Sequence, residues 1–247
     1  MKNKADYVGT ELELFSKAKN WRSYWVSKVK PSFGRCVLEV GAGIGTVTKF
    51  CCDNSFKKWV ALEPDSHMIE MLYNDRELGL LPEICDVRHG DLTAIRDTEI
   101  FDTIIYIDVL EHIEDDRGEL CKAYDLLAPN GFIIVLVPAY QFLYSSFDAS
   151  VGHYRRYSKK KLLEISPIDM SIVACYHLDS VGLCASIVNK IFLKQSNPTL
   201  KQILFWDRFL VCLSKILDPL IHNFFGKSLL VIWKKPENSL ITDANNI

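Results

Sequence analysis

Five short runs of almost uninterrupted apolar residues restrict the fold of this chain more than any other feature. They begin at residues 36, 58, 84, 101 and 131, and stretches with helical character separate most of them. Strands that are apolar on both faces are typical of parallel sheets, because the helical crossovers shield both faces from water. The pattern therefore predicts an α/β fold with a doubly wound parallel sheet.

The helices between these runs have recognisable ends. Ser66 is expected to cap a helix that follows the second run, and another helix is expected from residue 118 until Pro129 and Gly131 close it. Near the start of the chain, apolar residues three and four positions apart predict one amphipathic helix over residues 10–29.

The alternation weakens beyond residue 150. Two further runs, 171–178 and 228–235, predict strands, and about fifty residues of apolar, helical sequence separate them. Because no repeat, low-complexity segment or linker is visible, the 247 residues are expected to form one domain with a late helical insertion.

Composition excludes several classes of protein. The 29 basic and 31 acidic residues nearly cancel, which argues against a dedicated nucleic-acid-binding protein. The eight cysteines form no CxxC pair and favour buried, reduced thiols. The first residues do not resemble a signal peptide, and no apolar stretch is long enough to span a membrane, so a cytoplasmic protein is expected.

A glycine turn follows the first apolar run. Gly41, Gly43 and Gly45 alternate with other residues, and glycine there lets the backbone turn tightly and approach a ligand closely. The spacing is not the GxGxxG of dinucleotide-binding proteins, and Glu39 precedes the first glycine. A carboxylate at that position would repel a pyrophosphate and attract a cationic group. Such turns also occur simply to pack a helix on a strand.

A second acidic residue, Glu63, ends the next run about twenty positions after the first glycine. A carboxylate at this offset can accept hydrogen bonds from both hydroxyls of a ribose. The alternative is a solvated carboxylate at the end of a strand.

Four ordered segments, VLEVGAGIGT, ALEPD, HGDL and DVLEHI, together resemble the class I S-adenosylmethionine-dependent methyltransferases over roughly residues 35–140. The resemblance implies S-adenosyl-L-methionine as cofactor and a Rossmann-like, seven-stranded sheet of order 3-2-1-4-5-7-6. Its seventh strand, for which residues 228–235 are the candidate, would be antiparallel. Residues 1–34 would be an N-terminal helical cap, 35–150 the cofactor-binding core and 151–247 the acceptor side.

The resemblance also implies roles for single residues. Glu39 would meet the methionine ammonium, and Glu63 would hold the ribose hydroxyls. Asp108 would lie where the sulfonium, the methyl group and the acceptor meet. The remaining residues expected against the cofactor are Gly41, Ala42, Gly43, Gly45, Pro64, Asp91, Leu92 and Val109, with Asp91 accepting from the adenine amino group.

A methyl acceptor with a hydroxyl group needs a base. His112 and His153 are the histidines nearest to predicted strand ends, and His153 is the candidate base, with Asp108 and His112 lining the methyl-transfer site. A histidine in a loop is more often a surface or hydrogen-bonding residue.

Asp108, Glu111 and His112 form D-x-x-E-H, which resembles the E-x-x-E-H triplet of ubiquinone-biosynthesis O-methyltransferases, where a divalent cation can bind. Similar sequences are common in the wider family without any metal. We therefore expect no metal and treat these residues as polar lining.

The late segments suggest what the acceptor is like. Residues 153–161 carry five basic residues and no acid, which favours an anionic acceptor, although a solvated helix start capped by Ser158 explains the run equally well. Within the insertion, an apolar helical face is expected to be core, or otherwise a lid, a dimer surface or a membrane contact: Trp206, Phe209, Leu213, Ile216 and Leu220.

The sequence thus favours O-methylation of a small or glycan-type acceptor, anionic or lipid-linked, by a monomer or homodimer without nucleic acid. N-methylation of a small metabolite and a non-catalytic cofactor-binding partner protein are the alternatives. An NAD-dependent oxidoreductase is disfavoured by the glycine spacing and by Glu39.

Overall fold

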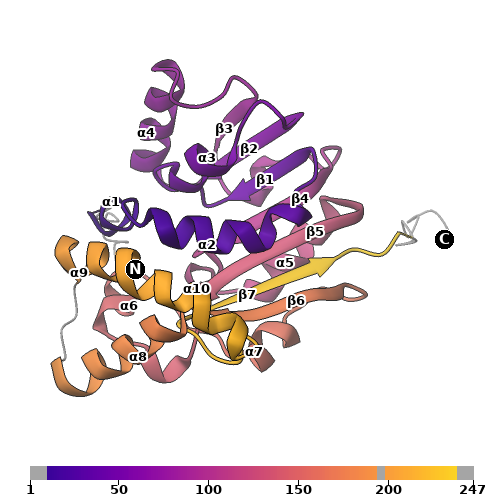
Figure 1. Cartoon of the computed structure of the whole chain (residues 1–247). Coiled ribbons are helices and arrows are strands. Elements are labelled where there is room, and N and C mark those ends of the chain that lie inside the picture. Colours follow the sequence, from indigo (N-terminus) through magenta and orange to yellow (C-terminus); the bar gives the residue numbers. More distant parts are fainter. Residues whose placement is uncertain (1–9, 194–197, 238–247) are drawn as a thin grey trace, which may run out of the picture.

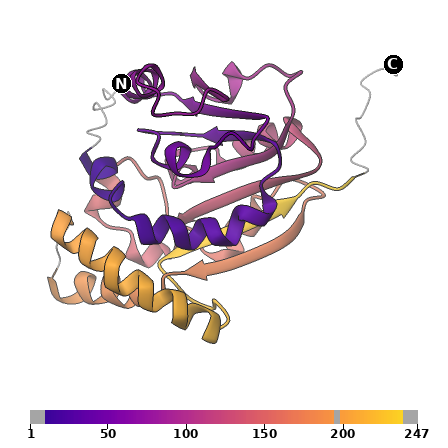
Figure 2. The same cartoon turned by 45° about the horizontal axis from the view of Figure 1, so that its top comes forward.

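A seven-stranded sheet forms the centre of the molecule (Figures 1 and 2). The computed structural model describes residues 10–193 and 198–237. The strands follow the order β3-β2-β1-β4-β5-β7-β6, and β7 runs antiparallel to both of its neighbours, as the resemblance implied. Their bounds are β1 (Cys36–Val40), β2 (Lys58–Glu63), β3 (Cys85–His89), β4 (Phe101–Ile107), β5 (Leu127–Pro138), β6 (Ser171–Leu178) and β7 (Ser228–Lys234).

Apolar clusters cover both faces of the sheet, which explains why the strands lack a polar face. Val37 of β1 lies beside Trp59 of β2 in one cluster, and the next pair, Leu38 and Val60, lies in the other. All four side chains are fully buried. Successive residues of a strand point to opposite faces, so only an apolar run can fill both clusters.

Helices supply the outer layers. Buried residues of α2 (Lys19–Val29) and α4 (Ser66–Glu77) join the first cluster, and those of α5 (Asp116–Asp125) and α7 (Lys159–Glu164) join the second. The remaining helices are α1 (Thr10–Phe15), α3 (Thr46–Cys51), α6 (Ser146–Ser150), α8 (Ser180–Val188), α9 (Leu200–Phe205) and α10 (Val211–Leu220).

Several boundaries differ from the sequence prediction. The N-terminal segment is two helices, α1 and α2, interrupted around Ala18, rather than one. Asp65, not Ser66, caps α4, because its carboxylate accepts from the amides of His67 and Met68 at 2.9 and 3.0 Å.

The fifth strand begins earlier than predicted. Helix α5 ends at Asp125 and β5 already starts at Leu127, so Pro129 and Gly131 lie within the strand. Leu127 pairs with Phe101 before a shift in register, and this irregularity accommodates the residues that looked like a helix end. Of the eight cysteines expected to be buried, only Cys52 and Cys85 are; Cys121 and Cys184 are exposed and the other four are half-buried.

The late insertion places its acids inside the molecule. Residues 200–220 are helical throughout, with a π-helical turn at Trp206–Leu210 between α9 and α10. Asp207 accepts from the backbone amides of Asn20 and Trp21 at the start of α2, where Ala18 offers no side-chain cap. Asp218 accepts in the same way from Asp179 and Ser180 at the start of α8.

This arrangement corrects the expectation that the apolar face of the insertion is core. Trp206 is half-buried, whereas Phe209, Leu213, Ile216 and Leu220 are exposed. The helix turns its acids inward because amides at two helix starts need acceptors there. Among the described residues, none of the helices has the length and apolar character to cross a bilayer.

The strand order reverses between β1 and β4, which lie side by side. The glycine turn leaves the carboxyl end of β1, and Gly41 has a left-handed φ of 69°. A Cβ there would lie 2.6 Å from a methyl carbon of Val109, which follows β4. Gly41 is therefore needed because the two chain segments touch at the edge of the sheet where open α/β folds bind ligands.

Replacing Gly41 tests this close contact, and Gly79 offers a matched control. Gly79 has the same φ of 69°, but a Cβ there would have no atom within 4 Å. We expect Gly79→Ala to lower the free energy of unfolding by about 1–2 kcal/mol, from backbone strain alone. Gly41→Ala should lose about 1–3 kcal/mol more, because Val109 must move. Urea denaturation measures both, and equal losses would contradict the contact.

Candidate functional site

The glycine turn brings its backbone to the carboxyl ends of β1 and β2. The Ala42 amide donates to the Leu62 carbonyl at 3.0 Å, which fixes the turn against β2. Gly45 has φ 73°, and a Cβ there would lie 2.5 Å from Leu72. At Gly43, φ 57°, a Cβ would contact only Leu12 at 3.4 Å. The turn is therefore packed against protein at Gly45 and has room for a ligand at Gly43.

Glu39 is a buried carboxylate beneath this turn. Its Oε2 accepts from the Thr48 hydroxyl at 2.7 Å and from the Trp59 indole at 2.8 Å. Burial raises the pKa of Glu39 to about 7, against the opposing effect of these two hydrogen bonds. Both of these side-chain hydrogen bonds go to Oε2, so Oε1 is the oxygen available to a cationic group.

Glu63 ends β2 and is also buried. Its two oxygens accept from the amides of Gly43 at 2.7 Å and Asp65 at 2.8 Å. Burial raises the pKa of the Glu63 carboxyl, and the two amide hydrogen bonds oppose the rise. Each carboxylate oxygen has a second lone pair, so the same group can still accept from two hydroxyls.

The residues expected around an adenine lie on neighbouring loops. Pro64 is exposed after β2, and its carbonyl lies 3.1 Å from His89 Nε2. Asp91 is exposed after β3, where Oδ1 accepts from the Thr93 amide and hydroxyl at 2.9 and 2.6 Å. Leu92 beside it is buried. Asp91 thus has a structural role as the cap of a short 3₁₀ turn, Leu92–Ala94.

Asp108 follows β4 in an unusual backbone conformation, with φ 54°. Non-glycine residues held in the left-handed region are often found at functional sites. The side chain is exposed to solvent, yet the surrounding protein raises its pKa to about 6, while His153, Lys227 and Arg156 act in the opposite direction. Asp108 is therefore reachable from solvent while the surrounding protein disfavours its charged form.

His153 is held by an acid that sequence reasoning missed. Its Nδ1 lies 3.0 Å from Asp148 Oδ1, and Arg156 binds both oxygens of the same carboxylate at 2.7 and 3.0 Å. Burial opposes ionisation of Asp148, but the hydrogen bonds from His153 and Arg156 outweigh it and hold the pKa below its ordinary value. With Nδ1 donating to Asp148, His153 Nε2 is left as a proton acceptor.

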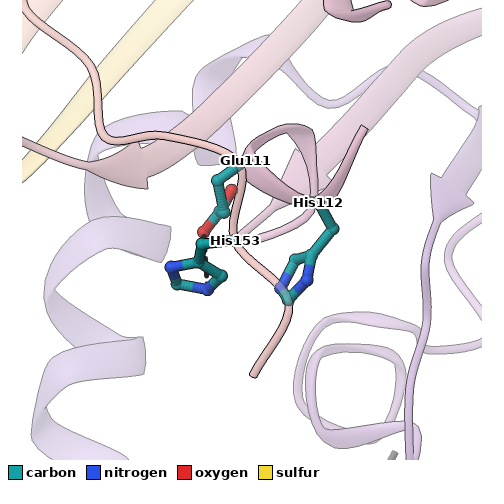
Figure 3. A group of neighbouring side chains, drawn as sticks. All are labelled: Glu111, His112 and His153. Carbon is teal, nitrogen blue, oxygen red and sulfur yellow. Dashed lines mark ion pairs between the residues drawn. The ribbon is translucent and has the colours of Figure 1, made fainter. Parts of the chain in front are cut away.

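Glu111, His112 and His153 form the group drawn in Figure 3. Their ligand atoms lie within 4.8 Å of one another, and the two imidazole rings meet edge to face with centroids 4.5 Å apart. The group differs from the D-x-x-E-H triplet of the sequence because His153 takes the place of Asp108. A carboxylate and two imidazoles can hold a divalent transition metal or move a proton.

Burial favours the uncharged forms of Glu111 and His112 within this group. Glu111 is fully buried and neither of its oxygens has a hydrogen-bond partner, although His153 Nε2 lies 4.0 Å from Oε1. Burial raises the pKa of Glu111 well above its ordinary value, and Asp108 adds to the rise. Burial also lowers the pKa of His112 to about 4. His112 is therefore uncharged near neutral pH, and burial favours the protonated form of Glu111.

The two arginines of the basic run 153–161 are used within the fold, and its three lysines are exposed. Arg155 binds Asp116 at 2.6 Å, and Arg156 binds Asp148. Ser158 caps α7 through the Lys161 amide at 3.2 Å, as the solvated-helix interpretation predicted. The arginines are therefore neutralised rather than presented to a ligand.

Lys227, by contrast, has no carboxylate within ion-pairing distance in the described part of the chain. Its ammonium lies 4.8 Å from the centre of the Trp206 ring, and burial lowers its pKa. Asp179, which accepts from the same Trp206 indole, opposes this lowering most, and Asp108 and Asp148 add smaller effects. Asp148 and Lys227 belong to no recognisable motif; Asp148 lies five residues before His153, and the fold adds Lys227 from the end of the insertion.

Comparison with known proteins identifies the family. The family model for a methyltransferase domain matches residues 13–167. No curated protein matches the sequence.

Several solved structures share the fold. Coclaurine N-methyltransferase bound to N-methylheliamine and SAH is 16% identical with a TM-score of 0.59, covering 88% of this chain and 72% of that one. The N-methyltransferase NodS from Bradyrhizobium japonicum WM9, in complex with S-adenosyl-L-homocysteine, is 14% identical with a TM-score of 0.57, covering 94% and 99%. An S-adenosylmethionine-dependent methyltransferase from Clostridium acetobutylicum ATCC 824 is 13% identical with a TM-score of 0.57, covering 89% and 92%.

At these identities the structures support the fold, and the family model supports the activity class. The chain belongs to the methyltransferase-domain family and is an S-adenosylmethionine-dependent methyltransferase with a class I, Rossmann-like fold.

Proposed function

We propose that this enzyme transfers the methyl group to a hydroxyl of a small or glycan-type acceptor. The observation that carries the proposal is the Asp148–His153 pair beside Asp108, with His153 Nδ1 held at 3.0 Å from the carboxylate. A hydroxyl loses its proton as it attacks, and an imidazole oriented by a carboxylate is a suitable general base.

The residues after β1 to β4 would bind S-adenosylmethionine, which supplies a methyl group already activated on a sulfonium. The space beside Gly43 is consistent with a bound cofactor, because only Leu12 lies near the position that a Cβ would take there. We assign Glu39 to the ammonium, Glu63 to the ribose hydroxyls and Asp91 to the adenine amino group. The rest of the cofactor surface would consist of Gly41, Ala42, Gly45, Pro64, Leu92, Asp108 and Val109.

The acceptor side would then work through positioning and proton transfer. His153 Nε2 takes the hydroxyl proton, and the Asp148 carboxylate stabilises the imidazolium that forms. Asp108 lines the point of transfer. His112, uncharged near neutral pH, lies beside the base, and burial favours the protonated form of Glu111.

Lys227 is the residue that favours an anionic acceptor. Its half-buried ammonium has no carboxylate within ion-pairing distance among the described residues, with Asp179 acting on it only from farther away, whereas Arg155 and Arg156 each have an ion-pair partner. A phosphate or carboxylate on the acceptor would supply the missing charge. A phosphorylated, nucleotide-linked or lipid-linked sugar meets this requirement. We also propose that the whole chain acts as one methyltransferase domain.

N-methylation is the second candidate, because two of the similar structures are N-methyltransferases. An unprotonated amine attacks without a base, so the two reactions differ in their need for His153.

Substitution of His153 separates these possibilities. Turnover is measured as release of S-adenosylhomocysteine on a panel of hydroxyl and amine acceptors. On a hydroxyl acceptor, His153→Ala should lower kcat by about 10²–10⁴-fold. Asp148→Asn should also lower kcat, and both variants should bind S-adenosylhomocysteine normally. His222→Ala, at an exposed histidine after α10, is the control. Normal turnover by His153→Ala would remove its role, and loss of activity on adding a chelator would favour a metal instead.

The Glu39 carboxyl predicts a pH dependence of cofactor binding. Its folded-state pKa of about 7 lies above the ordinary 4.5, so the apo protein loses stability from this group as the pH rises between those values. The affinity for the cofactor should instead increase as the pH rises through about 7, because the methionine ammonium of the cofactor binds the ionised Glu39 carboxylate more strongly. Calorimetric titration with S-adenosylhomocysteine tests this, and Glu39→Gln should flatten the profile. An unchanged pH profile in Glu39→Gln would rule out the contact.

A further inference from the structure

The helical segment 200–220 has an outer face opposite to the face that packs on the protein. The inner residues follow a spacing of four, four, three and four: Ile203, Asp207, Val211, Ser214 and Asp218, all buried. Phe205, Phe209, Leu213, Ile216 and Leu220 follow the same spacing two positions later. Two residues advance a helix by about 200°, so the second set lies on the opposite side.

This outer face is apolar and open to solvent. The exposed fractions of its side chains are 55% at Phe205, 56% at Phe209, 46% at Leu213, 65% at Ile216 and 71% at Leu220. Figures 1 and 2 place α9 and α10 at the edge of the molecule, on the far side of α2 and β7 from the β3 end of the sheet. A continuous apolar stripe with this exposure marks an interaction surface.

The charges beside the stripe have one sign. Lys201 precedes Phe205 by one helical turn, and Arg208 and Lys215 immediately precede Phe209 and Ile216. The two acids of the segment, Asp207 and Asp218, are buried and accept hydrogen bonds inside the fold. The side of the segment that faces solvent is therefore apolar and cationic, and it carries no acidic residue.

We propose that this outer face docks on an anionic lipid surface. An apolar helical face inserts among acyl chains, while flanking lysine and arginine residues meet anionic headgroups. A second copy of the chain is a less suitable partner. In a symmetric dimer formed through this stripe, the lysine and arginine side chains of one copy would lie against those of the other.

Docking would also orient the methyl-transfer site relative to the bilayer. Trp206 belongs to the same helical segment, donates its indole hydrogen to Asp179 at 2.7 Å and carries Lys227 over its ring. Lys227 follows the insertion and lies beside the Ala139 backbone at the end of β5, whose amide donates to the Lys227 carbonyl at 2.9 Å. The docking helix therefore contacts the segment that leads to the carboxyl end of the sheet. The docking inference rests on the outer face alone and does not require the proposed acceptor.

Vesicle flotation with the full chain tests the inference. Vesicles of phosphatidylcholine mixed with phosphatidylglycerol at low ionic strength should carry the protein, and vesicles of phosphatidylcholine alone should carry far less. The variant Phe209→Ser, Leu213→Ser, Ile216→Ser should lose binding. The variant Lys201→Gln, Arg208→Gln, Lys215→Gln should bind roughly a hundredfold more weakly, at about fivefold per charge.

Leu78→Ser with Leu80→Ser is the matched control, because these side chains are 64% and 58% exposed just beyond α4, away from the docking helix. It should bind vesicles like the unaltered chain, and melting temperatures verify that every variant folds. The inference would be overturned if the unaltered chain failed to bind anionic vesicles, or if the two triple variants bound them as well as the unaltered chain does. Self-association that depends on the stripe, without vesicle binding, would assign the face to a second copy. Binding of S-adenosylhomocysteine is measured separately, so failure of the methyltransferase proposal would be distinguishable.

Discussion

The contact between the ends of β1 and β4 is the constraint on which the rest of the site depends. Gly41 and Val109 approach so closely that a single added carbon would not fit. Strand order reverses at this point, so the loops after β1, β2, β3 and β4 all open toward the same edge. Glu39, Glu63 and Asp108, which are far apart in the sequence, therefore border one crevice.

Buried acids organise the half of the molecule beyond this crevice. Asp207 and Asp218 accept from backbone amides at the starts of α2 and α8, and Asp148 accepts from Arg156 and orients His153. A buried carboxylate is stable only when donors surround it, so each acid locks two segments of the chain together. The same demand explains why the late helix faces the protein with acids and faces solvent with apolar side chains.

The central strands could be predicted because each one has to fill both apolar clusters and so carries a continuous apolar run, whereas the edge strand β3 buries only Cys85 and Val87. Boundaries could not be predicted as well, since they depend on which neighbour satisfies a backbone group. Asp65 rather than Ser66 caps α4, and Leu127 enters the sheet because Phe101 pairs with it. The periodicity of Phe209, Leu213 and Ile216 indicated a helical face correctly, but periodicity alone cannot tell which side of a helix the protein covers.

The sequence by itself determined the class of fold, the glycine turn and the acids that follow the first two strands, because these features are local and leave a pattern of fixed spacing. Only the tertiary structure decided which groups surround the candidate base. Asp108, Lys227 and the Asp148–His153 pair come from three separate segments, and the pKa values of Asp108 and Lys227 depend on burial by the whole fold. The tertiary structure likewise paired Arg155 and Arg156 with acids while leaving Lys227 without a carboxylate among the described residues. Charge neutralisation is a matter of distance in space, which the order of residues along the chain does not contain.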